Sequence, residues 1–189
     1  IHMITNKSSL IAEAYNHTPT GEQLLFCERV ALFLQQEDEY RCFVLKGYAG
    51  TGKTTSVAAL VKVLLKFGLR SELLAPTGRA AKVMSQYSLR KALTIHKKIY
   101  RKRSAASPEM QFQLAPNLSE NTLFIVDEAS MVADEFNDTG SSILRDLLEY
   151  VYNKKNCFLL FVVDTAQLPP VGSLDSPALI DHYLKDKFS

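Results

Sequence analysis

The sequence predicts an α/β fold in which helices cover both faces of a parallel sheet. Short apolar runs alternate along the chain with longer segments whose apolar residues recur at helical spacing. The last of these runs, residues 157–163, is apolar throughout, which is typical of a strand covered on both faces. A glycine-rich turn joins the first run directly to a helical segment. Alternating strands and helices of this kind favour a parallel sheet.

Four segments are predicted strands because each is short, apolar and bounded by polar or turn residues: 41–46, 71–75, 123–126 and 157–163. Five segments have the length and apolar spacing of helices: 18–36, 55–65, 79–86, 94–100 and 143–152. The first helix opens with Thr20 and Gln23, which match a capping box. The second is expected to end at Gly68, since glycine commonly terminates a helix.

Three segments lack a regular pattern. Residues 4–17 are polar and are expected to form an irregular arm. Residues 101–119 contain Ser, Pro and Asn without periodicity, and are expected to form either a mobile loop or a small hairpin. Residues 134–141 are expected to form a polar loop.

One domain is expected over residues 18–180, because a chain of 189 residues is of single-domain size. Residues 1–17 would hold the arm, and the first three of them resemble a remnant of cloning, with the natural chain starting at or near Met3. Residues 181–189 are expected to be the start of a following region of a longer protein.

The composition is ordinary for a globular protein, with 47% hydrophobic and 22% charged residues. No apolar run approaches the roughly 20 residues of a membrane span, and the N-terminus has no signal-peptide pattern. The three cysteines, Cys27, Cys42 and Cys157, show no metal-binding spacing. We therefore expect a cytoplasmic protein with buried, reduced thiols and no membrane contact.

Charge is distributed unevenly along the chain. Residues 73–108 contain no Asp or Glu, whereas they carry nine of the 22 basic residues. These are Arg79, Lys82, Arg90, Lys91, Lys97, Lys98, Arg101, Lys102 and Arg103. Such segregation favours a basic face that binds a polyanion. The alternative is a solvated helix face followed by a basic loop.

Residues 47–54, Gly-Tyr-Ala-Gly-Thr-Gly-Lys-Thr, match the phosphate-binding loop pattern G-x-x-x-x-G-K-[ST] at every fixed position. Backbone N–H groups of such a loop and the positive end of the helix after it both face phosphate oxygens. Lys53 is expected to reach the outer phosphates of ATP, and the Thr54 hydroxyl to ligate Mg²⁺. The loop residues expected to contact ATP are Gly47, Ala49, Gly50, Thr51, Gly52, Lys53, Thr54 and Thr55.

Two adjacent carboxylates, Asp127 and Glu128, follow the third predicted strand. Beside a phosphate loop, Asp127 is expected to hold Mg²⁺ through water next to Thr54. Glu128 is then placed to orient and deprotonate the attacking water. Adjacent acids by themselves are more often a polar strand end, and it is the phosphate loop upstream that favours the catalytic interpretation.

A third candidate catalytic residue, Gln167, follows the fourth predicted strand. A neutral amide at this position can hydrogen-bond the terminal phosphate and so sense whether that phosphate is present. The alternative is a polar turn made rigid by Pro169 and Pro170.

Taken in order, blocks of this chain resemble the N-terminal motor domain of superfamily-one DNA helicases, in particular the RecD/Dda-like branch, which includes proteins like the exodeoxyribonuclease V alpha subunit. The blocks are TGEQ at 20–23, GYAGTGKTT at 47–55, APTGRAAK at 75–82, TIH at 94–96, VDEASM at 126–131, and Asp164 with QLPPVG at 167–172. Together they extend over residues 20–172.

The resemblance implies a RecA-like fold and an ATPase whose turnover drives 5′-to-3′ movement on single-stranded DNA. It also implies that the Gln23 amide contacts adenine, a role that competes with the capping box. The DNA contacts it implies are Pro76, Thr77, Gly78, Arg79, Thr94 and His96. All six lie in the acid-free stretch, although a lone histidine such as His96 is also often structural.

The chain departs from the family in two respects. The family usually has Gly where Val163 stands, and a β-branched residue there stiffens the strand end and would crowd the nucleotide site. Family members also have a second motor domain that carries an arginine finger, and some have nuclease partners. We expect the second domain to lie outside this chain, which alone would bind nucleotide weakly and hydrolyse it poorly.

Two other functions are compatible with parts of the pattern. A non-catalytic, nucleotide-dependent DNA clamp or scaffold subunit would use the same loop without turnover; Val163 favours it, whereas Lys53, Asp127 and Glu128 oppose it. A phosphate-loop kinase would leave the DNA-like blocks unexplained. The helicase motor is therefore the preferred hypothesis.

Overall fold

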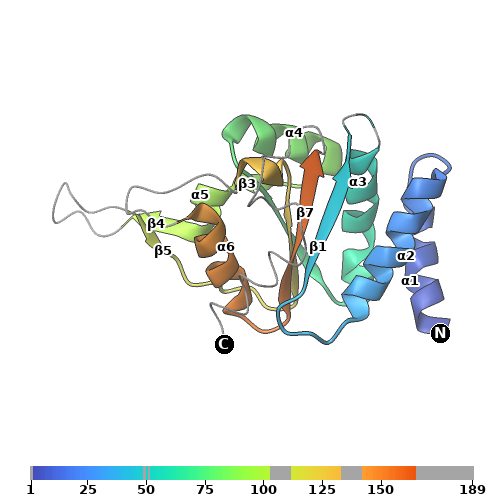
Figure 1. Cartoon of the computed structure of the whole chain (residues 1–189), viewed down its shortest axis with the longest axis horizontal. Coiled ribbons are helices and arrows are strands. Elements are labelled where there is room, and N and C mark those ends of the chain that lie inside the picture. Colours follow the sequence, from blue (N-terminus) through green and yellow to red (C-terminus); the bar gives the residue numbers. More distant parts are fainter. Residues whose placement is uncertain (1, 49, 51, 103–111, 133–141, 165–189) are drawn as a thin grey trace.

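The computed structural model describes residues 2–48, 50, 52–102, 112–132 and 142–164, and five strands of this part form one parallel sheet (Figure 1). The strand order is β1-β7-β6-β2-β3. The strands are β1 (Cys42–Gly47), β2 (Arg70–Ala75), β3 (Ala92–Thr94), β6 (Thr122–Val126) and β7 (Cys157–Asp164). The predicted parallel α/β sheet is thus confirmed.

Four of these strands are the predicted ones, each within one residue at either end. The fifth, β3, escapes prediction because it has only three residues and runs directly into α5 (Ile95–Ile99). A separate antiparallel pair joins β4 (Tyr100–Lys102) to β5 (Phe112–Leu114). This pairing is the strand part of the small hairpin expected for residues 101–119; residues 103–111 lie outside the described residues.

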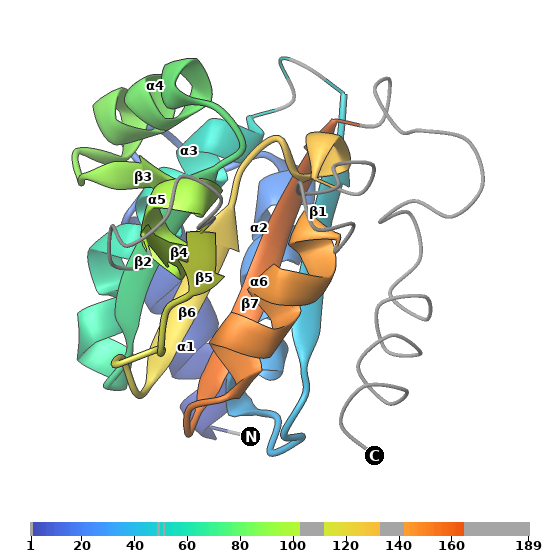
Figure 2. The same cartoon turned by 90° about the vertical axis from the view of Figure 1, so that its left-hand side faces the viewer.

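Helices lie on both faces of the sheet, as predicted (Figures 1 and 2). One face carries α1 (His2–Glu13), α2 (Gly21–Gln35) and α3 (Lys53–Val63), which a 3₁₀ turn, Leu64–Phe67, extends to Gly68. The other face carries α6 (Ile143–Tyr152), and α4 (Gly78–Ser88) packs beside β2, β3 and α3. None of the described helices has the length and apolar character needed to cross a membrane.

The prediction of an irregular arm at residues 4–17 is wrong, because α1 (His2–Glu13) is a helix that packs against α2 and α3. Ile11 is fully buried, and the Tyr15 hydroxyl donates to Ser56 Oγ at 2.5 Å. Lys62 Nζ donates to the carbonyl of Ala14 just beyond the helix, at 3.3 Å. A helix of twelve residues is marginal on its own and is stabilised by its tertiary contacts.

β7 is an inner strand of the sheet, between β1 on one side and β6 on the other. Its Phe158 and Phe161 are at most 1% exposed, and Phe124 of β6 is fully buried beside them. The three cysteines are free thiols; Cys27 and Cys157 are buried and Cys42 is half-buried. The fourth predicted strand is apolar throughout because β7 is an inner strand with helices on both faces of the sheet.

The register of the sheet brings the ends of the motif-bearing strands to one edge. Gly47 of β1 pairs with Asp164 of β7, and Val126 of β6 pairs with both Phe161 of β7 and Leu74 of β2. Ala75 of β2 in turn pairs with Thr94 of β3. The predicted phosphate loop, acidic pair and DNA blocks therefore follow strands of one parallel sheet at its carboxyl edge, where open α/β sheets bind ligands.

Candidate nucleotide-binding and DNA-contact site

The phosphate loop turns sharply between β1 and α3. Gly50 and Gly52 have φ of 82° and 83°, in the left-handed region that favours glycine. A Cβ on Gly52 would lie only 2.4 Å from Gln23 Nε2, so a side chain here would force the Gln23 amide to shift. Ala49 and Thr51 lie outside the described residues. The loop leads into α3 at Lys53, which directs the helix N-terminus toward the same space.

Lys53 is folded over the loop. Its Nζ donates to the carbonyl of Gly47 at 2.5 Å and to the carbonyl of Tyr48 at 2.8 Å. The ammonium group is thus held at the phosphate loop by oxygen acceptors. Phosphate oxygens are stronger, charged acceptors of the same kind, so the arrangement fits a phosphate ligand.

Gln23 connects the start of α2 to the phosphate loop. The side-chain Oε1 of Gln23 accepts from the backbone N of Thr20 at 3.0 Å, and the backbone N of Gln23 donates to Thr20 Oγ1 at 3.2 Å. This pair of bonds confirms the predicted capping box. The same side chain donates from Nε2 to Thr55 Oγ1 at 3.0 Å and to Gly52 O at 3.3 Å. Gln23 is 5% exposed, so both ends of a buried amide are satisfied by the protein.

A hollow of about 480 Å³ opens between α2, β1 and the phosphate loop. Gln23, Phe26 and Arg29 line it from α2, and Tyr48 and Lys53 line it from the loop. The volume is in the range of small-molecule sites, and the lining combines apolar and a few polar groups. Sequence reasoning missed Phe26 and Arg29, although their offsets of three and six residues from Gln23 place them on a similar helix face.

The acidic pair ends β6. Asp127 N donates to Leu74 O at 2.9 Å, which extends the strand pairing into the site. Asp127 Oδ1 accepts from Glu128 N at 2.8 Å, and its Oδ2 accepts from the Tyr87 hydroxyl at 2.7 Å. Glu128 is exposed and has a left-handed φ of 49°, which is uncommon for a residue other than glycine. Such conformations concentrate at functional sites.

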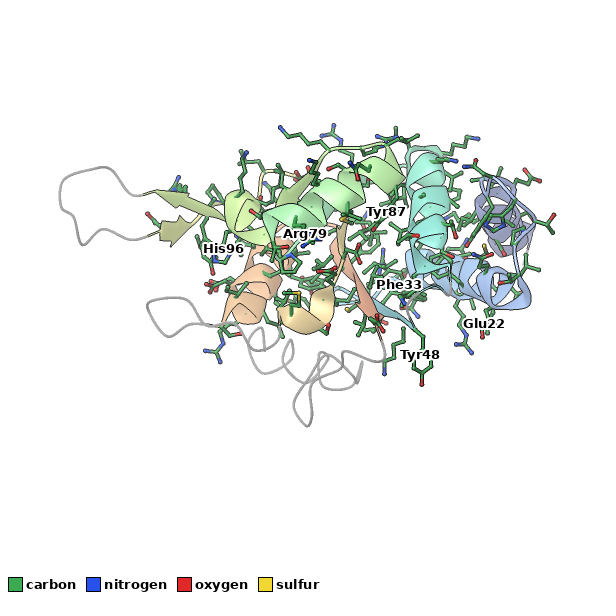
Figure 3. All side chains as sticks on the ribbon, turned by 90° about the horizontal axis from the view of Figure 1, so that it is seen from above. Glu22, Phe33, Tyr48, Arg79, Tyr87 and His96 are labelled. Carbon is green, nitrogen blue, oxygen red and sulfur yellow. The ribbon has the colours of Figure 1, made fainter. Side chains whose placement is uncertain are left out.

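Tyr87, on the last turns of α4, is a further residue of this edge to which the sequence assigned no role in the nucleotide site (Figure 3). Burial, together with the neighbouring charge of Asp127, raises the pKa of its hydroxyl well above the usual value. Tyr87 also lines a hollow of about 100 Å³ with Thr54 and Thr55 of the phosphate loop. It therefore contacts one of the two predicted Mg²⁺ residues, Asp127, and borders the same hollow as the other, Thr54.

The residues at this edge fit a divalent cation bound together with phosphates. No group of three or more His, Cys, Asp or Glu side chains within the described part of the chain could hold a metal alone. Mg²⁺ is usually bound through one or two protein groups, several waters and phosphate oxygens of the substrate. The exposed Thr54 hydroxyl and the half-buried Asp127 carboxylate are groups of this type.

The two predicted DNA blocks are built in the same way. Thr77 caps α4 by accepting from Ala80 N at 3.1 Å, and Thr94 caps α5 by accepting from Lys97 N at 3.2 Å. The strands that precede them, β2 and β3, are neighbours in the sheet. Both threonines thus have a structural role that the local chemistry explains in full.

Thr77, Gly78 and Arg79 are exposed at the start of α4, whereas Pro76 is buried beneath the turn. His96 is exposed on α5, with its ring 5.4 Å from that of Tyr100. Figure 3, which looks onto the carboxyl edge, shows Arg79 and His96 on these neighbouring helices.

The acid-free stretch supplies further exposed basic side chains. Those of the acid-free stretch that the structure shows as exposed are Arg79, Lys82, Arg90, Lys91, Lys97 and Arg101. Lys98 is less accessible and forms an ion pair with Glu72 at 3.3 Å.

The block that follows β7 is described only in its first residues. Asp164 ends the strand opposite Gly47, and Gln167 lies outside the described residues. Val163 is fully buried and pairs in register with Lys46. Its side chain belongs to the hydrophobic core.

A family model described as an AAA domain matches residues 29–181 of this sequence. The chain belongs to the AAA domain family. The fold and the phosphate loop of this AAA domain are those of a nucleotide-binding α/β protein, in agreement with the sequence prediction.

Relatives of this AAA domain include named helicases. The ATP-dependent RecD2 DNA helicase of Deinococcus radiodurans is 34% identical over 148 residues, which cover 77% of this chain and 18% of the relative. The ATP-dependent DNA helicase dda of Enterobacteria phage T4 is 27% identical over 146 residues, which cover 76% and 31%. The predicted resemblance to RecD/Dda-like helicases is confirmed.

Among solved structures, Bacteroides sp Pif1 in complex with ADP-AlF4 is 25% identical, with a TM-score of 0.49, and the match covers 86% of this chain and 36% of that one. The chain thus spans less than a third of the length of each of the two helicase relatives.

Proposed function

We propose that this chain is the ATP-binding motor domain of a DNA helicase, in which hydrolysis of ATP drives movement along single-stranded DNA. One observation carries the proposal: strands β1, β6 and β2 of a single sheet lead, at one edge, into the phosphate loop, the acidic pair and the α4 N-terminus with its exposed basic residues. ATP chemistry and DNA contact would then share one rigid edge. The names of the two helicase relatives support this assignment.

For ATP, the proposed roles follow from the hydrogen bonds at the loop. Lys53 would exchange the carbonyls of Gly47 and Tyr48 for phosphate oxygens. Gln23 would exchange its bonds to Gly52 and Thr55 for the adenine edge, while Thr20 continues to hold its Oε1. Binding is thus a substitution of acceptors, with little net change in the number of hydrogen bonds.

For hydrolysis, Thr54 and Asp127 would hold Mg²⁺, which neutralises charge that develops on the phosphates. Glu128 projects from the same edge and is exposed, so it is accessible to a water molecule that it would orient and deprotonate. Gln167 would sense the terminal phosphate.

For DNA, Thr77, Gly78 and Arg79 would contact phosphates at the N-terminus of α4, where backbone N–H groups and the helix dipole favour anions. Thr94 and His96 would extend the contact to the neighbouring helix. Because most of these residues are exposed and basic residues surround them, binding would be mainly electrostatic.

A second motor domain is part of the proposal, because each helicase relative is more than three times as long as the segment matched here. That domain would supply the groups that complete the ATP site and a second grip on DNA. Without it we expect slow turnover, since removal of an arginine finger reduces rates about 10³-fold or more.

The clamp hypothesis rested on Val163, whose side chain lies in the hydrophobic core. Among the described residues of the site, no other one favours binding without turnover.

The test is ATP hydrolysis by the full-length protein with and without single-stranded DNA. We expect DNA to stimulate phosphate release, and Lys53→Ala to abolish it. Hydrolysis that DNA does not stimulate, or no hydrolysis at all, would contradict the motor and favour the clamp.

A further inference from the structure

We infer that Tyr87 is a positioning residue for the magnesium site: its hydroxyl orients the Asp127 carboxylate toward Thr54. The inference rests on the proposed function, since it assigns a role within the ATP site. Tyr87 and Asp127 are 40 residues apart in sequence and are joined by a bond of 2.7 Å from the hydroxyl to Oδ2. The contact links α4 to the end of β6.

The Asp127 carboxylate is held at both oxygens. Glu128 N donates to Oδ1 at 2.8 Å and Tyr87 donates to Oδ2. A carboxylate has about four acceptor positions, so these two bonds leave about two for water molecules around a cation. Two donors at different oxygens also fix the rotation of the carboxylate group, which a single donor would not do.

The position of Tyr87 determines the side from which its hydroxyl approaches Asp127. The side chain is partly buried, and it lines the same small hollow as Thr54 and Thr55. It therefore approaches Asp127 from the side on which the phosphate loop begins α3. Partners that orient metal-binding groups in this way commonly contribute about ten- to hundredfold in metal affinity.

Tyr87 also lies in the last turn of α4, whose opposite end begins with the cap Thr77 and has Arg79 in its first turn. A displacement of α4 when DNA binds would move the tyrosine hydroxyl and with it the carboxylate. α4 would therefore connect the proposed DNA contacts physically to the magnesium site.

The test is the Mg²⁺ dependence of nucleotide binding, measured with a fluorescent ATP analogue and this 189-residue chain. For Tyr87→Phe we expect the half-saturating Mg²⁺ concentration to rise about tenfold. Binding of the analogue in EDTA should change by less than about twofold, because the phosphate loop itself is untouched. Asp127→Asn is the positive control and should show at least as large a rise.

The matched control is Tyr100→Phe. Tyr100 also donates its hydroxyl to a carboxylate, that of Asp146, and the two residues are 46 apart in sequence. The same chemical group is removed there from a contact between β4 and α6, on the face that carries α6. Its half-saturating Mg²⁺ concentration should stay within about twofold of the wild-type value.

A ligand-free measurement supports the binding assay. Thermal unfolding midpoints of Tyr87→Phe, Asp127→Ala and the double variant, without nucleotide or metal, should be non-additive, because Ala has no acceptor for the Tyr87 hydroxyl and the second substitution then removes a bond already lost. Additive midpoints would overturn the contact itself.

The remaining outcomes separate the two proposals. An unchanged Mg²⁺ dependence of Tyr87→Phe, or an equal loss of binding in EDTA, would overturn the positioning role while leaving the proposed function intact. A wild-type chain that binds the analogue neither with Mg²⁺ nor in EDTA would overturn the proposed function as well.

Discussion

The two halves of the carboxyl edge differ in how their polar groups are satisfied. In the nucleotide half, Lys53 and Gln23 are held by carbonyls and a hydroxyl of the protein. In the DNA half, Thr77, Arg79 and Lys82 are exposed to solvent at the start of α4. The first half must exchange hydrogen bonds to bind its ligand, whereas the second presents charge that is ready to use.

This difference implies two kinds of sensitivity. A buried network of hydrogen bonds fails when one member is displaced, because a polar group is then left unsatisfied. Exposed charges act additively and are screened by salt. Single substitutions should therefore have large effects in the nucleotide half and graded ones in the DNA half.

The largest effect should come from Glu128→Gln. Loss of the general base is expected to lower DNA-stimulated turnover by about 10²–10⁴-fold, while affinity for a fluorescent ATP analogue changes less than about twofold. Steady-state phosphate release by the full-length protein measures the first quantity. The control is Glu120→Gln, an exposed glutamate just before β6, at the opposite edge. Unchanged turnover would remove Glu128 as the base.

A second prediction tests the tight fit of the loop. In Gly52→Ala, the new Cβ would meet Gln23 Nε2 at 2.4 Å and a φ of 83° would be strained. We expect nucleotide affinity to fall about ten- to hundredfold, from roughly 1–3 kcal/mol of strain. Gly50→Ala adds similar strain without a nearby atom and should have a smaller effect, whereas Gly21→Ala should have none. Equal affinities for all three variants would refute the close packing of Gln23 on the loop.

In the DNA half, Arg79→Gln should weaken binding of oligodeoxythymidylate severalfold and lower the slope of log affinity against log salt by about 0.7. A fluorescence-anisotropy titration at three or more salt concentrations measures both quantities. Lys155→Gln is the matched control, since this exposed lysine lies before β7 at the opposite edge. An unchanged slope for Arg79→Gln would place the DNA elsewhere.

The smallest effect is expected for Tyr15→Phe, which removes the hydrogen bond between the segment after α1 and Ser56 of α3. The free energy of unfolding should fall by about 1 kcal/mol, the usual net value of such a bond. Urea denaturation measures this change, and affinity for the ATP analogue should stay within about twofold. A large loss of affinity would instead show that α1 supports the loop directly.

Most of the sheet could be predicted because its central strands are apolar throughout, and burial on both faces leaves a plain signal in the sequence. β3 could not be predicted, since three residues directly before a helix are too few to show the apolar spacing of a strand. The segment at residues 4–17 was misjudged because Ile11 and Tyr15 pack against other elements, and local pattern does not record tertiary contacts.

In the site, too, features set by local sequence could be predicted, whereas contacts between distant segments could not. The loop glycines were predictable because a left-handed backbone and a close approach at Gly52 demand glycine. The capping box of Gln23 was predictable from its spacing, but the bonds from its Nε2 to the loop join residues about 30 apart in sequence. Tyr87 was missed for the same reason: its partner lies on a strand whose position depends on the whole fold.

The length of α4 follows from what lies at its two ends. Thr77 caps the first turn beside the proposed DNA contacts, and Tyr87 reaches Asp127 ten positions later. One inserted residue would rotate the tyrosine by about 100° around the helix and turn it away from the carboxylate. A whole added turn would restore the direction but displace the hydroxyl by about 5.4 Å, beyond hydrogen-bonding distance. The helix therefore acts as a spacer with a fixed number of residues. We expect it to tolerate substitutions on its exposed side but neither insertions nor deletions.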